Sequence, residues 1–160
     1  MAGSAAEGKR MATDNRIAVS FEEVPELFSP EQIISLCARI LAAAGIRGRE
    51  LSVLVCGAPR MRELNRDWRG KDRPTDVLSF AQMEGELEGF DCSLLGDVVI
   101  CHEVLLAQAE EQDTTPAAEL ARLLVHGILH LLGHDHEGEA AAAERMRAEE
   151  ARIINELEGV

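Results

Sequence analysis

The sequence has no apolar run long enough to cross a bilayer, so we expect no membrane association. Residues 1–15 are rich in Ala, Gly and charge and lack the apolar segment of a secretory signal. The four cysteines form no CxxC pair, and we expect them to be reduced in a cytoplasmic protein. No internal repeat or linker interrupts the 160 residues. We therefore predict a disordered extension over residues 1–15 and a single domain over residues 16–160.

Charge is distributed unevenly along the chain. The formal net charge is -13, which argues against a general nucleic-acid binder, because phosphates are bound by local Lys and Arg. One short segment nevertheless holds six of the sixteen basic residues: Arg60, Arg62, Arg66, Arg69, Lys71 and Arg73. The sequence therefore allows a local cationic patch on an otherwise acidic protein.

Hydrophobic periodicity and helix-capping residues predict a small α+β domain. Strands are expected in the apolar, β-branched segments, at residues 16–22, 51–56, 76–81 and 94–101. Helices are expected at residues 30–44, 58–68, 103–112, 116–133 and 139–157. The order βαβαββααα predicts a single domain with a mixed four-stranded sheet and helices packed on it.

A histidine-rich segment, HGILHLLGHDH, carries the strongest chemical signal. His126 and His130 are four residues apart, so on a helix their side chains share one face, with Cβ atoms roughly 5–6 Å apart. Gly133 can adopt positive φ and turn the chain, which brings His136 back toward the same point. Three neutral imidazoles leave the fourth position of a tetrahedral ion open, as in catalytic zinc sites. The spacing predicts one Zn²⁺ per chain, bound by His126, His130 and His136.

The same spacing matches the metzincin signature HExxHxxGxxH, with one departure. Gly127 stands where those proteases carry the Glu that acts as general base. A zincin-like metal-binding helix is therefore expected, although peptide hydrolysis does not follow from it. His134 is expected to point away from the metal. Asp135 either orients a ligand histidine through a hydrogen bond or caps the turn.

Three segments together resemble a known family. WRGKDRPTDVLSF, LLGDVVIC and HGILHLLGHDH occur in the order found in YbeY, the bacterial family of single-strand-specific endoribonucleases of rRNA maturation. The resemblance implies a zinc-bound α+β fold and an RNA substrate. It also implies a role in processing the 3′ end of 16S rRNA and in ribosome quality control, with the small ribosomal subunit and assembly factors as partners.

The resemblance also assigns individual residues. The metal ligands fall on the three histidines already identified, the functional arginine of the family falls on Arg69, and the Asp of its LGD strand falls on Asp97. Two departures are visible: Ala81 replaces a common Pro, and His134 replaces a common aromatic residue. Asp97 is a candidate supporting residue, and it is equally interpretable as a structural hydrogen-bond acceptor.

Arg69 has a physical rationale of its own. A guanidinium can bind a phosphate through two hydrogen bonds and stabilise the charge that develops in the transition state. Lys71 and Arg73 would add point charges to the substrate-binding surface. A solvated charge cluster is the alternative interpretation of this segment. We therefore expect Arg69 and the metal ligand His126 to be catalytic.

The sequence is compatible with three functions. The leading hypothesis is a zinc-dependent endoribonuclease in which water or the ribose 2′-OH attacks phosphorus. The second is a metalloprotease or amidase of metzincin-like geometry, which Gly127 disfavours. The third is a non-catalytic ribosome-assembly factor with a structural metal, which the open coordination position disfavours.

Overall fold

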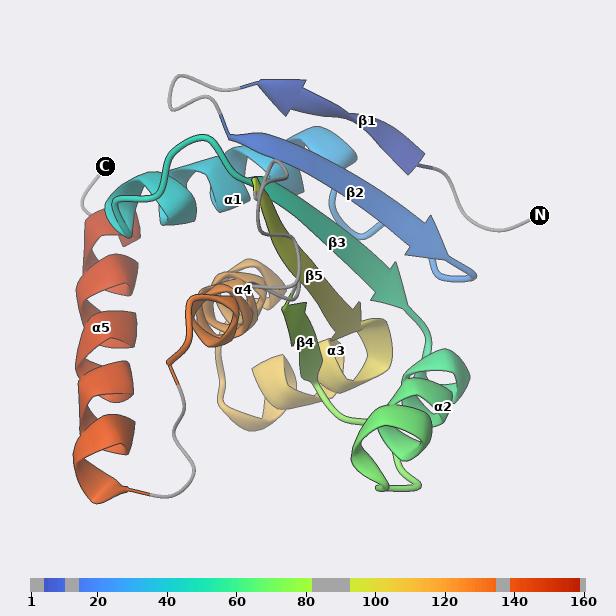
Figure 1. The fold of residues 1–160 in the computed structure, drawn as a ribbon. Helices are drawn as coiled ribbons and strands as arrows, with labels where there is room; N and C mark the ends of the chain where they lie inside the picture. Colours follow the sequence, from blue (N-terminus) through green and yellow to red (C-terminus); the bar gives the residue numbers. More distant parts are fainter. Residues whose placement is uncertain (1–4, 11–14, 82–92, 135–138, 159–160) are drawn as a thin grey trace.

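The centre of the fold is a mixed sheet, seen in a computed structural model that describes residues 5–10, 15–81, 93–134 and 139–158 (Figure 1). Its strands are β1 (Ala5–Arg10), β2 (Arg16–Glu22), β3 (Glu50–Cys56), β4 (Val77–Ala81) and β5 (Leu94–Cys101). Within the described residues the strand order is β1-β2-β3-β5-β4, with β2, β3 and β5 parallel and with β1 and β4 antiparallel to their neighbours. Strands β2 to β5 confirm the four that the sequence predicts.

Strand β1 falls within residues 1–15, for which the sequence predicts a disordered extension. Ala5–Arg10 pairs antiparallel with β2, with a register irregularity between Ala6 and Lys9. The pairing occupies backbone groups on the edge of β2 that would otherwise face solvent. The segment AAEGKR is poor in β-branched and aromatic residues, so its sequence gives no strand signal. The segment is extended because its backbone pairs with the edge of β2.

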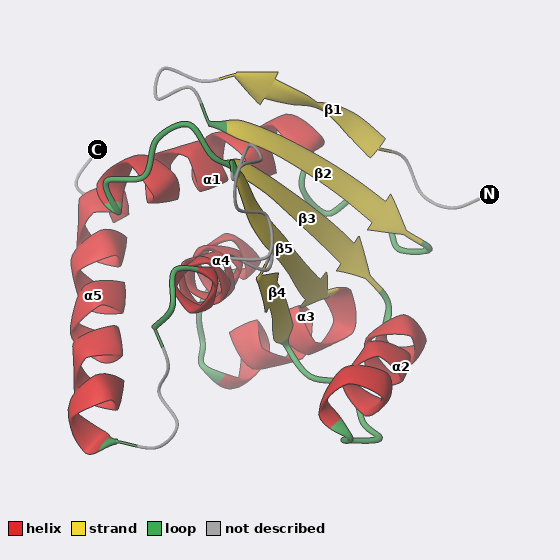
Figure 2. Ribbon diagram, viewed as in Figure 1, coloured by secondary structure: helices red, strands yellow, loops and turns green. Residues whose placement is uncertain are grey.

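Helices cover both faces of the sheet (Figure 2). They are α1 (Pro30–Ala43), α2 (Ala58–Arg69), α3 (His102–Glu111), α4 (Pro116–Leu131) and α5 (Ala140–Glu158). Their ends follow local chemistry: the hydroxyl of Ser29 accepts from the backbone N–H of Gln32, and Gly133 turns the chain after α4 at φ 97°. Within the described ranges, no helix has the length and apolar character required to cross a bilayer.

The side chains of β5 divide between two hydrophobic clusters. Val98 and Ile100 belong to the larger cluster, which includes the inner faces of α1 and α4. Val99 and Cys101 belong to a smaller cluster with Met61 of α2. Because successive strand residues point to opposite faces, this division shows that α4 and α2 lie on opposite sides of β5.

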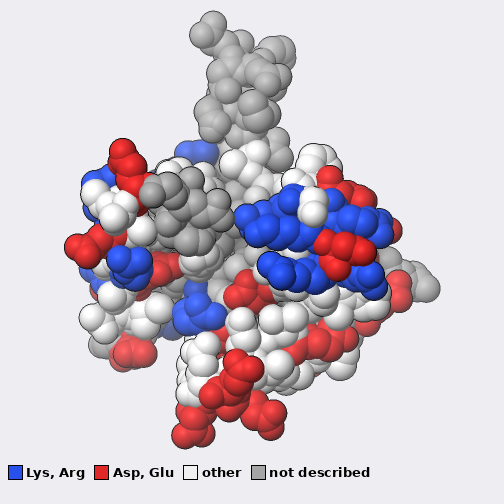
Figure 3. All heavy atoms as spheres, turned by 90° about the horizontal axis from the view of Figure 1, so that it is seen from below, with Lys and Arg blue, Asp and Glu red and all other residues white. Residues whose placement is uncertain are grey.

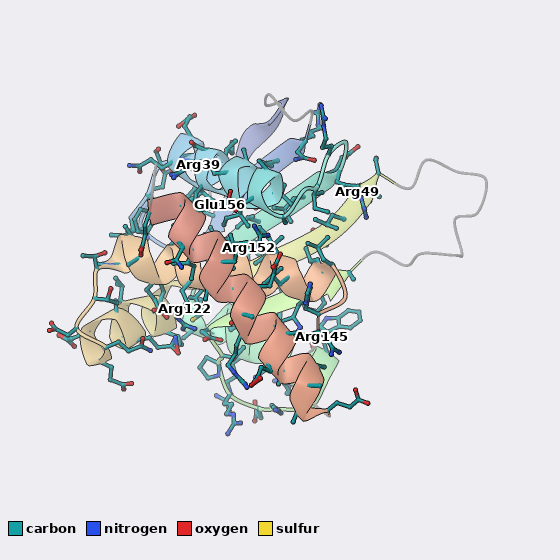
Figure 4. All side chains as sticks on the ribbon, turned by 90° about the vertical axis from the view of Figure 1, so that its left-hand side faces the viewer. Arg39, Arg49, Arg122, Arg145, Arg152 and Glu156 are labelled. Carbon is teal, nitrogen blue, oxygen red and sulfur yellow. The ribbon has the colours of Figure 1, made fainter. Side chains whose placement is uncertain are left out.

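Helix α5 is held against α1 at its C-terminal half. The guanidinium of Arg152 donates to the carbonyl oxygen of Ala43 at 2.9 Å, and Arg39 donates to the carbonyl oxygen of Leu157 at 2.6 Å (Figure 4). These contacts fix a helix whose other long neighbour is α4. They therefore set the position of the α5 side chains that face α4.

Candidate active site

His126 and His130 form a preorganised pair on α4. Their Nε2 atoms lie 3.2 Å apart, and their rings meet at a centroid distance of 4.7 Å. Two nitrogens bound to one tetrahedral zinc at about 2.0–2.1 Å would lie roughly 3.3–3.4 Å from each other. The observed separation therefore fits two ligands of a single ion, and the helical spacing that the sequence predicts is present.

Of the remaining members of the predicted site, the structure describes His134, whereas His136 and Asp135 lie outside the described residues. Among the residues that the structure describes, no group of three His, Cys, Asp or Glu side chains is arranged to hold a metal. His134 is half-buried beside the histidine pair and lies close enough to Glu149 to affect its pKa. The pKa of Glu149 is lowered mainly by the hydrogen bond from Arg152, with a smaller contribution from His134.

Glu150 on α5 orients His126, a role that the sequence analysis missed. The Nδ1 of His126 lies 2.5 Å from Oε2 of Glu150, and both side chains are about three-quarters buried. A carboxylate at Nδ1 favours the tautomer with its proton on that nitrogen. Nε2 then carries the lone pair, which is the form of histidine that binds a metal.

The sequence does contain a signal for Glu150. Met146 and Ile153 are buried on the inner face of α5, and Glu150 lies on the same face, four residues after one and three before the other. A carboxylate at a core position of an amphipathic helix requires a buried partner. The partner is 24 residues away in the chain, so the pattern alone does not identify it.

Neutralising Glu150 is expected to weaken metal binding. Glu150→Gln keeps the shape of the side chain and removes the negative charge at Nδ1, so zinc affinity should fall by about 10- to 100-fold. Competition with a chromophoric chelator measures this change. Glu149→Gln is the matched control, because Glu149 pairs with Arg152 on the same turn. Equal zinc affinity in the two variants would contradict the orienting role of Glu150.

Gly127 has a structural reason to lack a side chain. A Cβ atom at this position would lie 2.9 Å from Cγ1 of Val98 and 3.2 Å from Cγ2 of Val77. The hydroxyl of Ser79 also donates to the carbonyl oxygen of Gly127 at 2.8 Å, which joins α4 to β4. The close packing of α4 on the sheet leaves no room for the glutamate that metzincins carry here.

Gly127→Ala is expected to destabilise the fold by about 1–3 kcal/mol, because the new methyl group overpacks the contact between helix and sheet. Helix propensity alone acts in the opposite direction, favouring alanine by up to about 1 kcal/mol. The sign of the change in the free energy of unfolding, measured by urea denaturation, therefore shows which of the two effects is larger. A variant more stable than the parent would show that the contact can expand without cost, so that helix propensity decides the sign.

A cavity of about 670 Å³ brings together residues from α2, β4 and α4. Its polar lining residues are Arg69, Lys71, Thr75, Asp76, Ser79, His126, His130 and His134. The predicted ligands His126 and His130 thus share a cavity with Arg69 and Lys71, although the two histidines lie far from the two basic residues in the sequence. Arg73 is not among the lining residues.

Arg69 is positioned by the end of α2. It is the last residue of the helix, and Gly70 ends the helix in the left-handed conformation at φ 72°. The side-chain amide of Asn65, itself buried, donates to the carbonyl oxygen of Arg73 at 2.8 Å and closes the turn. Arg73 therefore contributes its backbone to the turn that carries Arg69 and Lys71.

Asp97 lies on the opposite face of the sheet from His126. It alternates with Val98, which packs beneath Gly127, and shares its face with Val99. Burial raises the pKa of Asp97, and a hydrogen bond with Ser52 partly offsets this effect. The structure does not bring Asp97 to the cavity around the histidines.

The basic cluster of α2 gathers on one face of the molecule, with carboxylates among the cations (Figure 3). Ion pairs join Arg60 to Glu22 at 3.3 Å, Arg62 to Asp72 at 2.8 Å and Arg66 to Asp67 at 3.1 Å. Lys71 and Arg73 form no ion pair within the described ranges. These carboxylates offset the charge on the earlier turns of α2, whereas Lys71 and Arg73 add positive charge on the turn beside the cavity.

A second polar group anchors the start of β4 to α3 and α4. The carboxylate of Glu119 is almost completely buried and accepts from Arg122 at 2.6 Å (Figure 4). Gln108 donates both to Glu119 at 3.0 Å and to Asp76 at 3.2 Å. Asp76 also accepts from the N–H of Val77. This network fixes one wall of the cavity.

Comparison with known proteins gives a consistent result. The family model described as "Endoribonuclease YbeY" matches residues 14–158. The chain is 40% identical over 149 residues to an endoribonuclease YbeY of Sulfurihydrogenibium, with 93% of this chain and 97% of that protein covered. It is 41% identical to one of Halorhodospira halophila, with 89% and 94% covered. The solution structure of Thermotoga maritima TM1509 superposes with a TM-score of 0.61 at 28% identity, covering 91% of this chain and 89% of that chain.

Proposed function

The chain belongs to the endoribonuclease YbeY family and is a hydrolase acting on RNA, and we propose that it cleaves single-stranded RNA with one zinc ion. In this proposal His126, His130 and His136 hold the ion, and Arg69 binds the scissile phosphate. The observation that carries it is the shared cavity, in which two histidines with ligand spacing face Arg69 and Lys71.

The residues of the chain divide the chemistry among them. A bound zinc ion supplies Lewis-acid activation of the phosphodiester. Glu150 keeps the Nδ1 proton on His126, so that Nε2 is available as a ligand. The guanidinium of Arg69 stabilises negative charge on the phosphate oxygens through paired hydrogen bonds, and Lys71 adds a point charge. The attacking group is either water or the ribose 2′-OH.

The cellular role follows from the family. We propose that the substrate is ribosomal RNA, that cleavage matures the 3′ end of 16S rRNA in the cytoplasm, and that the enzyme acts in ribosome quality control. The small ribosomal subunit and its assembly factors would then be its partners. The acidic character of the chain supports this context, because a protein of net charge -13 has little long-range attraction for free RNA. Partners that deliver the substrate would compensate for that weakness.

The experiment that tests the proposal uses the purified full chain with its metal content measured. We expect it to cleave a single-stranded RNA, to leave a duplex of the same sequence intact, and to leave casein intact. A chelator should abolish cleavage, and added zinc should restore it. Cleavage of casein, or RNA cleavage that persists after the metal has been removed, would contradict the proposal.

A further inference from the structure

Trp68, the single tryptophan of the chain, is unusually exposed for so large an apolar side chain. It lies in the last turn of α2, and 69% of its surface is accessible to solvent. Its ring meets that of Phe80 edge to face, with centroids 5.7 Å apart and planes at 69°. Aromatic rings of this size usually bury most of their surface, so the open indole surface is available to a ligand.

The two rings lie on α2 and on the edge strand β4, elements that also contribute residues to the cavity of the candidate active site. Trp68 directly precedes Arg69, which lines the cavity. Phe80 lies between Ser79 and Ala81, which also line the cavity, but its ring points to the other face of β4, toward α2. Phe80 itself packs against the buried cluster beneath α2, so the support under the indole is fixed. Trp68 is therefore held at a defined position next to the phosphate-binding arginine.

We propose that Trp68 is a stacking platform for a nucleobase of the RNA strand whose phosphate is bound at Arg69. The inference rests on the proposed RNA-cleavage function and adds a base-binding subsite to it. Proteins that bind single strands combine cationic grooves along the backbone with aromatic rings beneath the bases. Lys71, which forms no ion pair within the described ranges, supplies positive charge on the turn that follows.

Stacking at Trp68 also gives a physical reason for preferring single strands. The bases of a duplex are stacked on each other and paired, whereas those of a single strand can turn outward onto a protein ring. Every base has a π face, so the contact tolerates different sequences. We therefore expect the subsite to select for unpaired RNA without selecting strongly for one base.

The surroundings of Trp68 favour a nucleobase over an apolar protein partner. In the described part of the chain, the other exposed large apolar side chains are Leu27 and Leu94, which precede α1 and begin β5. They lie on elements other than α2 and β4, so they extend no apolar patch around the indole. Its sequence neighbours Asp67 and Arg69 are charged and exposed. An apolar protein interface would need a larger apolar patch than this single ring provides. A nucleobase can stack on one ring while its neighbouring phosphates contact charged side chains.

Trp68 is the only tryptophan in a chain without tyrosine, so its intrinsic fluorescence reports on this subsite directly. The probe is a single-stranded 2′-O-methyl oligonucleotide, in which the 2′-oxygen cannot attack, titrated into the zinc-loaded full chain. Its length is checked by gel after each titration, so that cleavage by water is detected. Binding is followed independently by the anisotropy of a label on the oligonucleotide. We expect saturable quenching with the same midpoint as the anisotropy change. An oligonucleotide with abasic positions should bind about tenfold more weakly and quench less.

Variants separate stacking from general apolar contact. Trp68→Leu should bind the base-containing probe about tenfold more weakly and lose the difference between the two probes. Trp68→Phe should retain most of the affinity, because it keeps an aromatic face. Leu94→Ala is the matched control for removing an exposed apolar side chain, and it should bind as the parent does. Thermal unfolding verifies that each variant is folded.

The outcomes distinguish the platform from the RNA proposal. Binding by anisotropy without quenching, or parental affinity in folded Trp68→Leu, would overturn the platform while leaving the RNA-cleavage function standing. Failure to bind or cleave any single-stranded RNA would overturn both. Equal weakening by Trp68→Leu and Leu94→Ala would also overturn the platform, because it would show a general effect of surface truncation.

Discussion

Replacing Arg69 with alanine is expected to lower kcat/KM for single-stranded RNA by on the order of 10²-fold or more, with metal content and fold retained. The guanidinium lines the same cavity as His126 and His130. Arg69 is the only arginine among the described residues that line this cavity, so no other guanidinium there can replace its stabilisation of charge. Arg69→Lys should recover only part of the loss, because an ammonium keeps the charge but cannot form the paired hydrogen bonds. Steady-state cleavage of a labelled single-stranded RNA measures both effects.

The control for Arg69 is another arginine of the same helix. Arg66 lies three residues earlier, is exposed, and forms an ion pair with Asp67 at 3.1 Å. It does not line the cavity. Arg66→Ala should therefore change cleavage only slightly. Full nuclease activity in a folded, metal-loaded Arg69→Ala protein would show that the arginine belongs only to the charged surface.

Removing either histidine of the α4 pair is expected to abolish stable zinc binding. His126→Ala or His130→Ala leaves too few nitrogens for the ion, and the loss of affinity should exceed the roughly 10- to 100-fold expected for an outer partner such as Glu150. His136→Ala should behave in the same way, whereas His134→Ala should keep one zinc per chain. Metal analysis after dialysis gives the stoichiometry.

Thermal unfolding provides a second measure of zinc binding in these histidine variants. A ligand that binds only the folded state stabilises it by about 4 kcal/mol at a thousandfold excess over Kd. Zinc should therefore raise the Tm of the parent and of His134→Ala, and leave the Tm of His126→Ala almost unchanged. Loss of metal in His134→Ala, with His136→Ala still loaded, would contradict the ligand assignment.

Local patterns explain why so much of the fold follows from the sequence. Strand β5 spans the predicted residues 94–101, and α4 begins at Pro116 after the predicted cap Thr115, whose hydroxyl accepts from the N–H of Ala118 at 3.0 Å. The spacing of His126 and His130 depends only on the geometry of one helix. Features encoded within a few residues of each other are readable without knowledge of the tertiary structure.

The features that the sequence left unpredicted depend on contacts between distant segments. Glu150 acts through a histidine on another helix, and β1 exists because the edge of β2 accepts it. The face on which Asp97 lies is decided by the packing of α4 on the neighbouring Val98. Likewise, Arg62 belongs to the predicted cationic patch, but the fold brings it to Asp72 at 2.8 Å.

The most direct test of the account is the dependence of RNA cleavage on zinc stoichiometry. The full chain is stripped with a chelator, and cleavage of a single-stranded RNA is measured as zinc is added back in substoichiometric steps. The account predicts that activity rises in proportion to zinc and reaches its plateau at one ion per chain. Cleavage by the stripped protein at the full rate, or no cleavage in the fully loaded protein, would contradict it.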